Sequence, residues 1–362
     1  MKRPGFGIPE SLYIAGRRKF SPFGSTRWPH ILHCSCITRK MDKLPAFGRD
    51  VFAASVPTFQ IFGDLLRRPE RLALLNSIPR EVHRFGHHER QTLDLYRSSH
   101  KSQRRSIFIF IHGGANVSGG SIAPEIKGEV VYKGLGYFLA EELGYDAIII
   151  NYRLLQHGAV FNTGGEDLDL VIRWVTENLC LEGEKRDMVV MGNSAGGLHL
   201  ASWLFDEAFT SSTQRVLEPS AKLHLRRAII LSSTMLADPD NEFVAPMVPN
   251  LLRYYKTREN IVQNAPLNLM RRKFGRRSAD KDGGSTMLLP HLLLVAAEYD
   301  PIFLIETEKT LMTEWKELGG QAEYWELQGH NHLSPPLALG TGDKAAEAWG
   351  FELAKRLSDI SP

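Results

Sequence analysis

Two kinds of hydrophobic pattern alternate along this chain. One is a short unbroken apolar run such as Ile107–Ile111, and strands that are apolar at every position are typical of buried parallel sheets. The other places apolar residues at helical spacing, most clearly within residues 165–179, where Leu168, Val171 and Val175 share one face. The alternation predicts an α/β fold with a mostly parallel sheet flanked by helices. The expected strands are 92–96, 107–111, 147–150, 188–191, 228–231, 291–299 and 322–327, and the expected helices include 135–143 and 165–179.

The pattern also divides the chain into parts. Residues 1–45 form a basic tail that is expected to be disordered, and residues 46–85 mix aromatics with leucines at roughly helical spacing, which predicts helices of a cap. Residues 86–362 carry the alternating pattern of the main domain. Within it, residues 235–288 are too long for a simple connection and are expected to form a lid insertion.

The strand at residues 188–191 leads into Gly192-Asn193-Ser194-Ala195-Gly196-Gly197, and an apolar-periodic helix follows. A serine at the tip of a tight strand-to-helix turn needs neighbours without side chains two positions before and after it, because the turn brings those positions against backbone. Gly192 and Gly196 meet this need. Any glycine-rich loop can match the short pattern, but the flanking strand and helix favour Ser194 as a catalytic nucleophile.

The strand Ile107–Ile111 runs into His112-Gly113-Gly114-Ala115. Two glycines at the carboxyl end of a strand leave their backbone N–H groups unobstructed. With the N–H of Ala195, those of Gly113 and Gly114 are therefore candidates to bind the oxyanion of a tetrahedral intermediate. The alternative is a plain turn of two glycines.

A serine nucleophile requires an imidazole to take its proton and an acid to orient that imidazole. The strand at residues 291–299 ends in Glu298-Tyr299-Asp300-Pro301, and Pro301 suits the first turn of a following helix. Asp300, just after the strand, is the expected acid, whereas its competitor Glu298 lies inside the strand. The last strand runs into Gly329-His330-Asn331-His332, and one of these two histidines is the expected base.

These motifs resemble the α/β-hydrolase fold, specifically its hormone-sensitive-lipase-like (fold-3) esterase branch, over most of residues 91–362. That family carries His-Gly-Gly, Gly-Asp-Ser-Ala-Gly-Gly, Asp-Pro-Leu and Gly-x-x-His-x-Phe. The corresponding residues here begin at His112, Gly192, Asp300 and Gly329. The resemblance implies a mostly parallel sheet of the eight-stranded type with a helical cap, and it implies that His332 rather than His330 is the base.

Three departures from the family pattern bear on the substrate. Asn193 replaces the usual elbow aspartate, Ala115 and Asn116 replace the third glycine or aromatic after His-Gly-Gly, and residues 155–157 replace Ala-Pro-Glu. None of them touches the triad. Because residues beside the oxyanion hole shape the acyl pocket, the same motifs are also compatible with an arylformamidase, which cleaves an N-formyl amide.

The lid insertion carries the candidate pocket residues. Its apolar and aromatic residues have the spacing of one or two amphipathic helices: Phe243, Met247, Leu251, Leu252, Tyr254 and Tyr255. We expect this insertion and the 46–85 helices to enclose the substrate, with Tyr254 and Tyr255 as substrate-binding residues. A helical excursion that packs on its own is the alternative.

Charge and cysteine content narrow the class of protein. The net charge is +3, but residues 1–41 hold eight Lys or Arg and one Glu, so the rest of the chain is near −4 and nucleic-acid binding is not expected. The three cysteines argue against a disulfide framework and for a reducing compartment. The histidines show no metal-ligand spacing, and no apolar run is long enough to span a membrane.

The location of the protein depends on the tail. The preferred expectation is a cytoplasmic protein, in which residues 1–41 are an extension or Met41 is the working initiator. The Arg- and Ser-containing, acid-poor composition is also that of a mitochondrial transit peptide, which is the alternative.

Together these residues predict a serine hydrolase that cleaves a small carboxylic ester through an acyl-enzyme, with no cofactor and no metal. The expected partner is a small-molecule ester. An amidase of the arylformamidase type and a non-catalytic ligand-binding protein of the same fold remain alternatives.

Overall fold

The computed structural model describes residues 40–100, 106–123, 126–275 and 287–358, which belong to one compact unit, Thr38–Pro362. Most of the predicted tail lies outside the described residues. Its last part does not: Lys40–Phe47 is a 3-10 helix, and Leu44 is fully buried. This helix thus begins before residue 45, the predicted end of the tail, and Leu44 is already part of the core.

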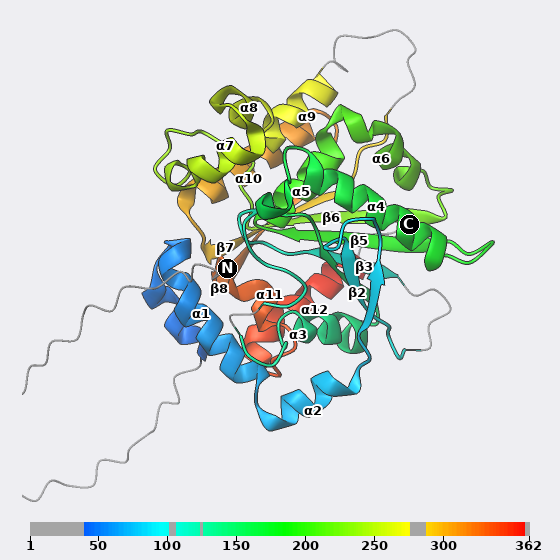
Figure 1. Ribbon diagram of the computed structural model, residues 1–362, viewed down its shortest axis with the longest axis vertical. Helices are drawn as coiled ribbons and strands as arrows, with labels where there is room; N and C mark the ends of the chain where they lie inside the picture. Colours follow the sequence, from blue (N-terminus) through cyan, green and yellow to red (C-terminus); the bar gives the residue numbers. More distant parts are fainter. Residues whose placement is uncertain (1–39, 101–105, 124–125, 276–286, 359–362) are drawn as a thin grey trace, which may run out of the picture. The chain divides into compact units, whose positions relative to one another are not determined.

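The sheet has eight strands in the order β1-β2-β4-β3-β5-β6-β7-β8 (Figure 1). The β1–β2 and β2–β4 pairs are antiparallel, and every other neighbouring pair is parallel. The strands are β1 (Glu81–Arg84), β2 (Thr92–Tyr96), β3 (Ile107–Ile111), β4 (Asp146–Asn151), β5 (Arg186–Asn193), β6 (Leu223–Leu231), β7 (Leu292–Tyr299) and β8 (Ala322–Asn331). The predicted mostly parallel sheet is thus present.

Helices cover both faces of the sheet (Figure 1). On one face lie α4 (Thr163–Asn178), α5 (Ala195–Phe205), α6 (Thr210–Leu217), α9 (Pro266–Phe274) and α10 (Ile302–Glu317). On the other lie α1 (Val51–Leu66), α2 (Pro69–Ser77), α3 (Lys133–Tyr137), α11 (Ser334–Ala338) and α12 (Lys344–Ser358). The two further helices α7 (Val248–Tyr255) and α8 (Arg258–Gln263) belong to the lid insertion.

Strand β3 shows why its sequence is apolar throughout. Successive side chains of a strand point to opposite faces of the sheet. Ile107, Ile109 and Ile111 pack in the hydrophobic cluster on the α4–α5 side, whereas Phe108 and Phe110 pack in the cluster on the α1–α12 side. All five are fully buried, so only a continuous apolar run satisfies this strand.

Two predicted regions differ in detail. The cap segment 46–85 contains α1 and α2, but it ends in β1, an edge strand that pairs with β2. We expected only helices there; Glu81-Val82-His83-Arg84 has a single apolar residue and so carries little strand pattern. The predicted helix 135–143 begins as α3 and continues as a π-helical turn, Phe138–Glu142.

The insertion at residues 235–288 is helical in its described part, with three α-helices where its spacing predicted one or two. It contains the 3-10 turn Ala245–Met247 followed by α7, α8 and α9, and its residues 276–286 lie outside the described part. Among the described helices, none has both the length and the apolar content needed to cross a bilayer.

Candidate active site

Ser194 sits at a sharp turn between β5 and α5 with φ 53° and ψ −119°, a region that non-glycine residues rarely adopt. A Cβ on Gly192 would lie 2.3 Å from the Gly196 carbonyl oxygen, and one on Gly196 would lie 2.1 Å from the Ile111 carbonyl oxygen. Glycine is therefore required at both positions, for the reason that the sequence indicated. The Ser194 N–H donates to the Leu231 carbonyl at 2.9 Å, which ties the turn to β6.

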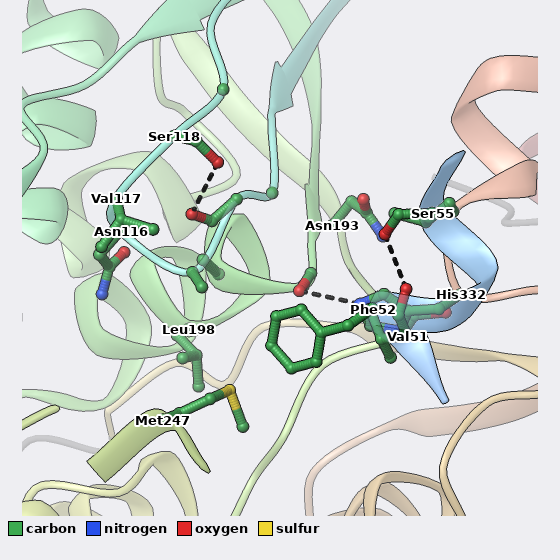
Figure 2. Close-up of a pocket in the computed structure, with 18 of the residues that line it drawn as sticks. Val51, Phe52, Ser55, Asn116, Val117, Ser118, Asn193, Leu198, Met247 and His332 are labelled. Atoms are coloured by element: carbon green, nitrogen blue, oxygen red, sulfur yellow. Dashed lines mark hydrogen bonds between the residues drawn. The ribbon is translucent and has the colours of Figure 1, made fainter. Parts of the chain in front are cut away.

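The structure brings Ser194, His332 and Asp300 into a hydrogen-bonded chain at the carboxyl ends of β5, β8 and β7. Ser194 Oγ lies 3.0 Å from His332 Nε2, a contact drawn as a dashed line in Figure 2. His332 Nδ1 lies 2.7 Å from Asp300 Oδ1. A carboxylate only accepts hydrogen bonds, so Nδ1 carries the proton and Nε2 presents its lone pair to the serine hydroxyl.

Asp300 is fully buried, and its second oxygen is also occupied. Oδ2 accepts the Ala297 N–H and the Ser232 hydroxyl, both at 2.6 Å. The guanidinium of Arg49, just before α1, donates to the Asp300 carbonyl at 2.6 Å. These contacts fix the carboxylate so that Oδ1 faces the imidazole.

Glu298 and His330, the alternatives to Asp300 and His332 in the sequence, make contacts away from Ser194. Glu298 Oε2 accepts the Gly329 N–H at 2.6 Å, which joins β7 to β8. His330 is 3% exposed, with Nδ1 2.9 Å from the Ser334 hydroxyl, and burial lowers its pKa to about 3. The structure therefore brings Asp300 and His332, and not these two residues, to Ser194.

Gly113 and Gly114 lie beside the serine. A Cβ on Gly113 would be 3.1 Å from Ser194 Cβ, and Gly114, with φ 121°, has no room for a side chain because the Ser118 carbonyl oxygen would lie 2.2 Å away. Within the described residues, nothing accepts a hydrogen bond from the backbone N–H of Gly113, Gly114 or Ala195. These N–H groups therefore remain available to an acceptor atom of a bound ligand.

Arg90 holds this oxyanion loop, which we define as residues 112–119, and sequence reasoning missed it. Its Nε donates to the Tyr152 carbonyl at 2.8 Å, and its Nη2 donates to the Gly119 carbonyl and lies 3.5 Å from His112 Nε2. Tyr152 in turn donates from its hydroxyl to the His112 carbonyl at 3.0 Å. No local signal identifies Arg90, because it lies in the β1–β2 connection, far from the loop in sequence.

His112 is fully buried between these groups. Its ring stacks on Tyr152 with centroids 4.4 Å apart, and Nδ1 lies 2.6 Å from the Gly113 carbonyl oxygen. Burial lowers the pKa of His112 to about 3, so the ring is neutral at physiological pH. A neutral ring donates from Nδ1 to the Gly113 carbonyl and keeps Nε2 as an acceptor toward Arg90.

A second buried group that the sequence did not reveal lies behind the elbow. Glu308, on α10, is fully buried, and its Oε1 accepts the Ser233 N–H at 2.8 Å. The Ser233 hydroxyl donates to the Ser194 carbonyl at 2.7 Å. Burial raises the pKa of Glu308 well above its usual range, which favours the neutral acid under the turn.

A cavity of about 630 Å³ opens at Ser194, a size typical of small-molecule sites. Figure 2 shows α1 residues Val51, Phe52 and Ser55 near His332, and Asn116 and Val117 on the other side of the view. The lid insertion contributes its apolar side chains to the wall: Phe243, Val244, Met247, Leu251 and Tyr255. Phe52 and Val56 of α1 are also part of the wall and remain 63% and 64% exposed.

Only one of the two predicted substrate-binding tyrosines reaches the cavity. Tyr255 lines it, whereas Tyr254 does not. Tyr254 turns to the interior, where its ring lies 6.2 Å from His199 and its hydroxyl faces the backbone at Gly164. Adjacent helical residues point in directions about 100° apart, so Tyr254 and Tyr255 do not share a face. The part of the chain that the structure describes contains no group of three or more His, Cys, Asp or Glu placed to hold a metal.

Comparison with known proteins agrees with this architecture. Residues 93–225 match the BD-FAE family model, an esterase-like α/β-hydrolase family. No curated protein matches the sequence. Three solved structures are similar over most of their length.

Esterase B from Lactobacillus rhamnosis is 14% identical with a TM-score of 0.57, covering 88% of this chain and 95% of the esterase. A thermostable esterase from Pseudomonas putida is 16% identical with a TM-score of 0.57 and the same two coverages. The hyperthermophilic esterase from Pyrobaculum calidifontis is 17% identical with a TM-score of 0.54, covering 84% and 93%. The chain thus has the α/β-hydrolase fold that its motifs predicted.

Proposed function

We propose that this chain of α/β-hydrolase fold is a serine esterase that cleaves a small carboxylic ester through an acyl-enzyme. The observation that supports this most directly is the contact of Ser194 Oγ with His332 Nε2 at 3.0 Å, with Asp300 2.7 Å from the other ring nitrogen. A hydroxyl, an imidazole and a buried carboxylate in this order are the groups that nucleophilic acyl transfer needs.

In the acylation step, Ser194 Oγ attacks the ester carbonyl carbon while its proton passes to His332 Nε2. The imidazolium is stabilised by the Asp300 carboxylate. The carbonyl oxygen gains negative charge in the transition state, and the N–H groups of Gly113, Gly114 and Ala195 are the proposed donors to it. When the carbon–oxygen ester bond breaks, His332 gives its proton to the leaving alcohol.

In the deacylation step, a water molecule gives a proton to His332 and attacks the acyl carbon. The bond to Ser194 breaks, the serine recovers the proton from His332, and the carboxylic acid leaves. The open cavity beside Ser194 admits both the ester and the water. No cofactor enters this proposed sequence.

Steady-state hydrolysis of p-nitrophenyl acetate, butyrate and octanoate, and of N-formylkynurenine, tests the proposal. Wild type should hydrolyse at least one p-nitrophenyl ester, and Ser194→Ala should lower kcat by about 10⁶-fold. Ser212→Ala is the matched control, because this remote serine donates to the Phe209 carbonyl and should leave kcat unchanged. Activity that survives in Ser194→Ala, or cleavage of the formyl amide alone, would overturn the esterase proposal.

A further inference from the structure

One side of the cavity carries an amide with no partner in the described part of the protein. Asn116 follows Gly113 and Gly114 in the oxyanion loop, lines the cavity and is 5% exposed. Its backbone is fixed, because its carbonyl accepts the Leu155 N–H at 2.8 Å. Its side-chain amide makes no hydrogen bond to any described residue, and Oδ1 is buried and unpaired.

Tyr255 brings a second polar group to the same cavity. It ends α7, is 6% exposed and stacks on Phe161 with ring centroids 5.3 Å apart. Its hydroxyl makes no hydrogen bond to any residue that the structure describes. Val117, the neighbour of Asn116, packs on the cluster that contains Tyr255 and Leu155, so the loop at Asn116 lies next to the end of α7.

Most of the other residues on this side are apolar, apart from Asn250 of α7. Leu198, Met247 and Leu251 line it, and Figure 2 shows Leu198 and Met247 together on the side of the view where Asn116 lies. A buried amide oxygen without a partner is costly in such surroundings, since it does not recover the hydrogen bonds that it makes to water in the unfolded chain. A ligand that supplies both a donor and an acceptor would satisfy this oxygen and the Tyr255 hydroxyl.

We propose that Asn116 and Tyr255 form a polar subsite that binds a secondary carboxamide in the substrate. The proposal rests on the esterase function above and specifies its substrate class. A carboxamide offers one N–H and one C=O, which complement the acceptor and donor of the Asn116 side chain and the hydroxyl of Tyr255. A site built this way discriminates against an apolar analogue of the same size, because binding that analogue leaves the buried groups unpaired.

Two pairs of isosteric esters test the subsite on each side of the scissile bond. On the acyl side, p-nitrophenyl 3-acetamidopropanoate is compared with p-nitrophenyl 5-methylhexanoate. On the alcohol side, 2-acetamidoethyl butanoate is compared with 4-methylpentyl butanoate, with acid release followed by pH-stat. In at least one of the two pairs, the kcat/KM of wild type should be about tenfold higher for the amide-containing ester than for the apolar ester. A factor of this size is the effect of one to two hydrogen bonds.

The variants remove one polar group each. Asn116→Gly deletes the amide without strain, because the φ of 62° at this position suits glycine, and Tyr255→Phe deletes only the hydroxyl. Each should lower the amide preference about threefold or more, and the double variant should abolish it. Tyr254→Phe is the matched control, since this hydroxyl points away from the cavity, and it should keep the wild-type ratio.

Binding to Ser194→Ala separates this inference from the proposed function. Calorimetric Kd values for the same esters report the preference whether or not the chain hydrolyses them. A lower Kd for the amide member of one pair, lost in Ser194→Ala combined with Asn116→Gly, supports the subsite. The subsite would be overturned if, in both pairs, the apolar ester bound and reacted as well as the amide-containing ester or better, judged by Kd and kcat/KM. This outcome would count against the subsite even if the chain is an active esterase.

Discussion

Replacing Asp300 by Asn changes one atom and tests the orientation of the proposed base. Asp300 Oδ2 accepts two donors, the Ala297 N–H and the Ser232 hydroxyl. In Asp300→Asn the amide oxygen keeps that position, because an NH₂ group there would face two donors. The NH₂ group therefore takes the position of Oδ1, 2.7 Å from His332 Nδ1.

An N–H donor at that position forces the other tautomer of His332. Nδ1 must present its lone pair to the new NH₂, so the ring proton moves to Nε2, and Nε2 can no longer accept the proton of Ser194. The same substitution in serine-protease triads lowers kcat by about 10⁴-fold, and we expect a loss of that size here. It corresponds to about 5.5 kcal/mol of transition-state stabilisation.

The assay is kcat for the p-nitrophenyl ester that wild type hydrolyses fastest. The control is Glu298→Gln, in which the amide oxygen can still accept the Gly329 N–H, so kcat should stay within a few-fold of wild type. Thermal unfolding of both variants should remain cooperative, because the amide oxygen introduced at either position keeps the backbone contact of the native acid. The reasoning is refuted by Asp300→Asn retaining kcat within tenfold of wild type, or by Glu298→Gln showing the larger loss.

Two further predictions concern the surroundings of the triad. Arg90→Ala removes the contacts that hold the oxyanion loop at Gly119 and His112. The kcat should therefore fall about 10- to 100-fold, with KM little changed. An unaltered kcat would show that the loop is rigid without Arg90. Burial lowers the pKa of His112 and His330 to about 3 and that of His199 to about 4. Below about pH 6.5 the folded state then binds fewer protons than the unfolded state. As the pH falls from about 6.5 to about 4, each of these histidines should therefore lower the free energy of unfolding by up to about 1.4 kcal/mol per pH unit. Urea unfolding at pH 7, 6 and 5 measures this slope, which His330→Gln should reduce; a pH-independent midpoint would contradict it.

Local patterns predicted the elements that carry the proposed chemistry. The continuous apolar run Ile107–Ile111 predicted a buried strand, because both faces of the sheet are covered there. The glycines around Ser194 predicted a turn that only glycine fits. Asp300 could be chosen over Glu298 from its position after the strand. Edge strand β1 gave no such signal, because a half-exposed four-residue strand has little apolar pattern.

The sequence by itself determined the α/β architecture, the serine turn and the helical lid insertion, because strand burial, tight turns and helical periodicity are short-range properties of the residues concerned. Only the tertiary structure decided which side chains meet. It turned Tyr255 toward the pocket and Tyr254 away from it, and it brought Arg90 to the oxyanion loop. The physical reason is that these contacts join residues far apart in the chain, so they depend on how helices and loops pack across the sheet and not on any local pattern.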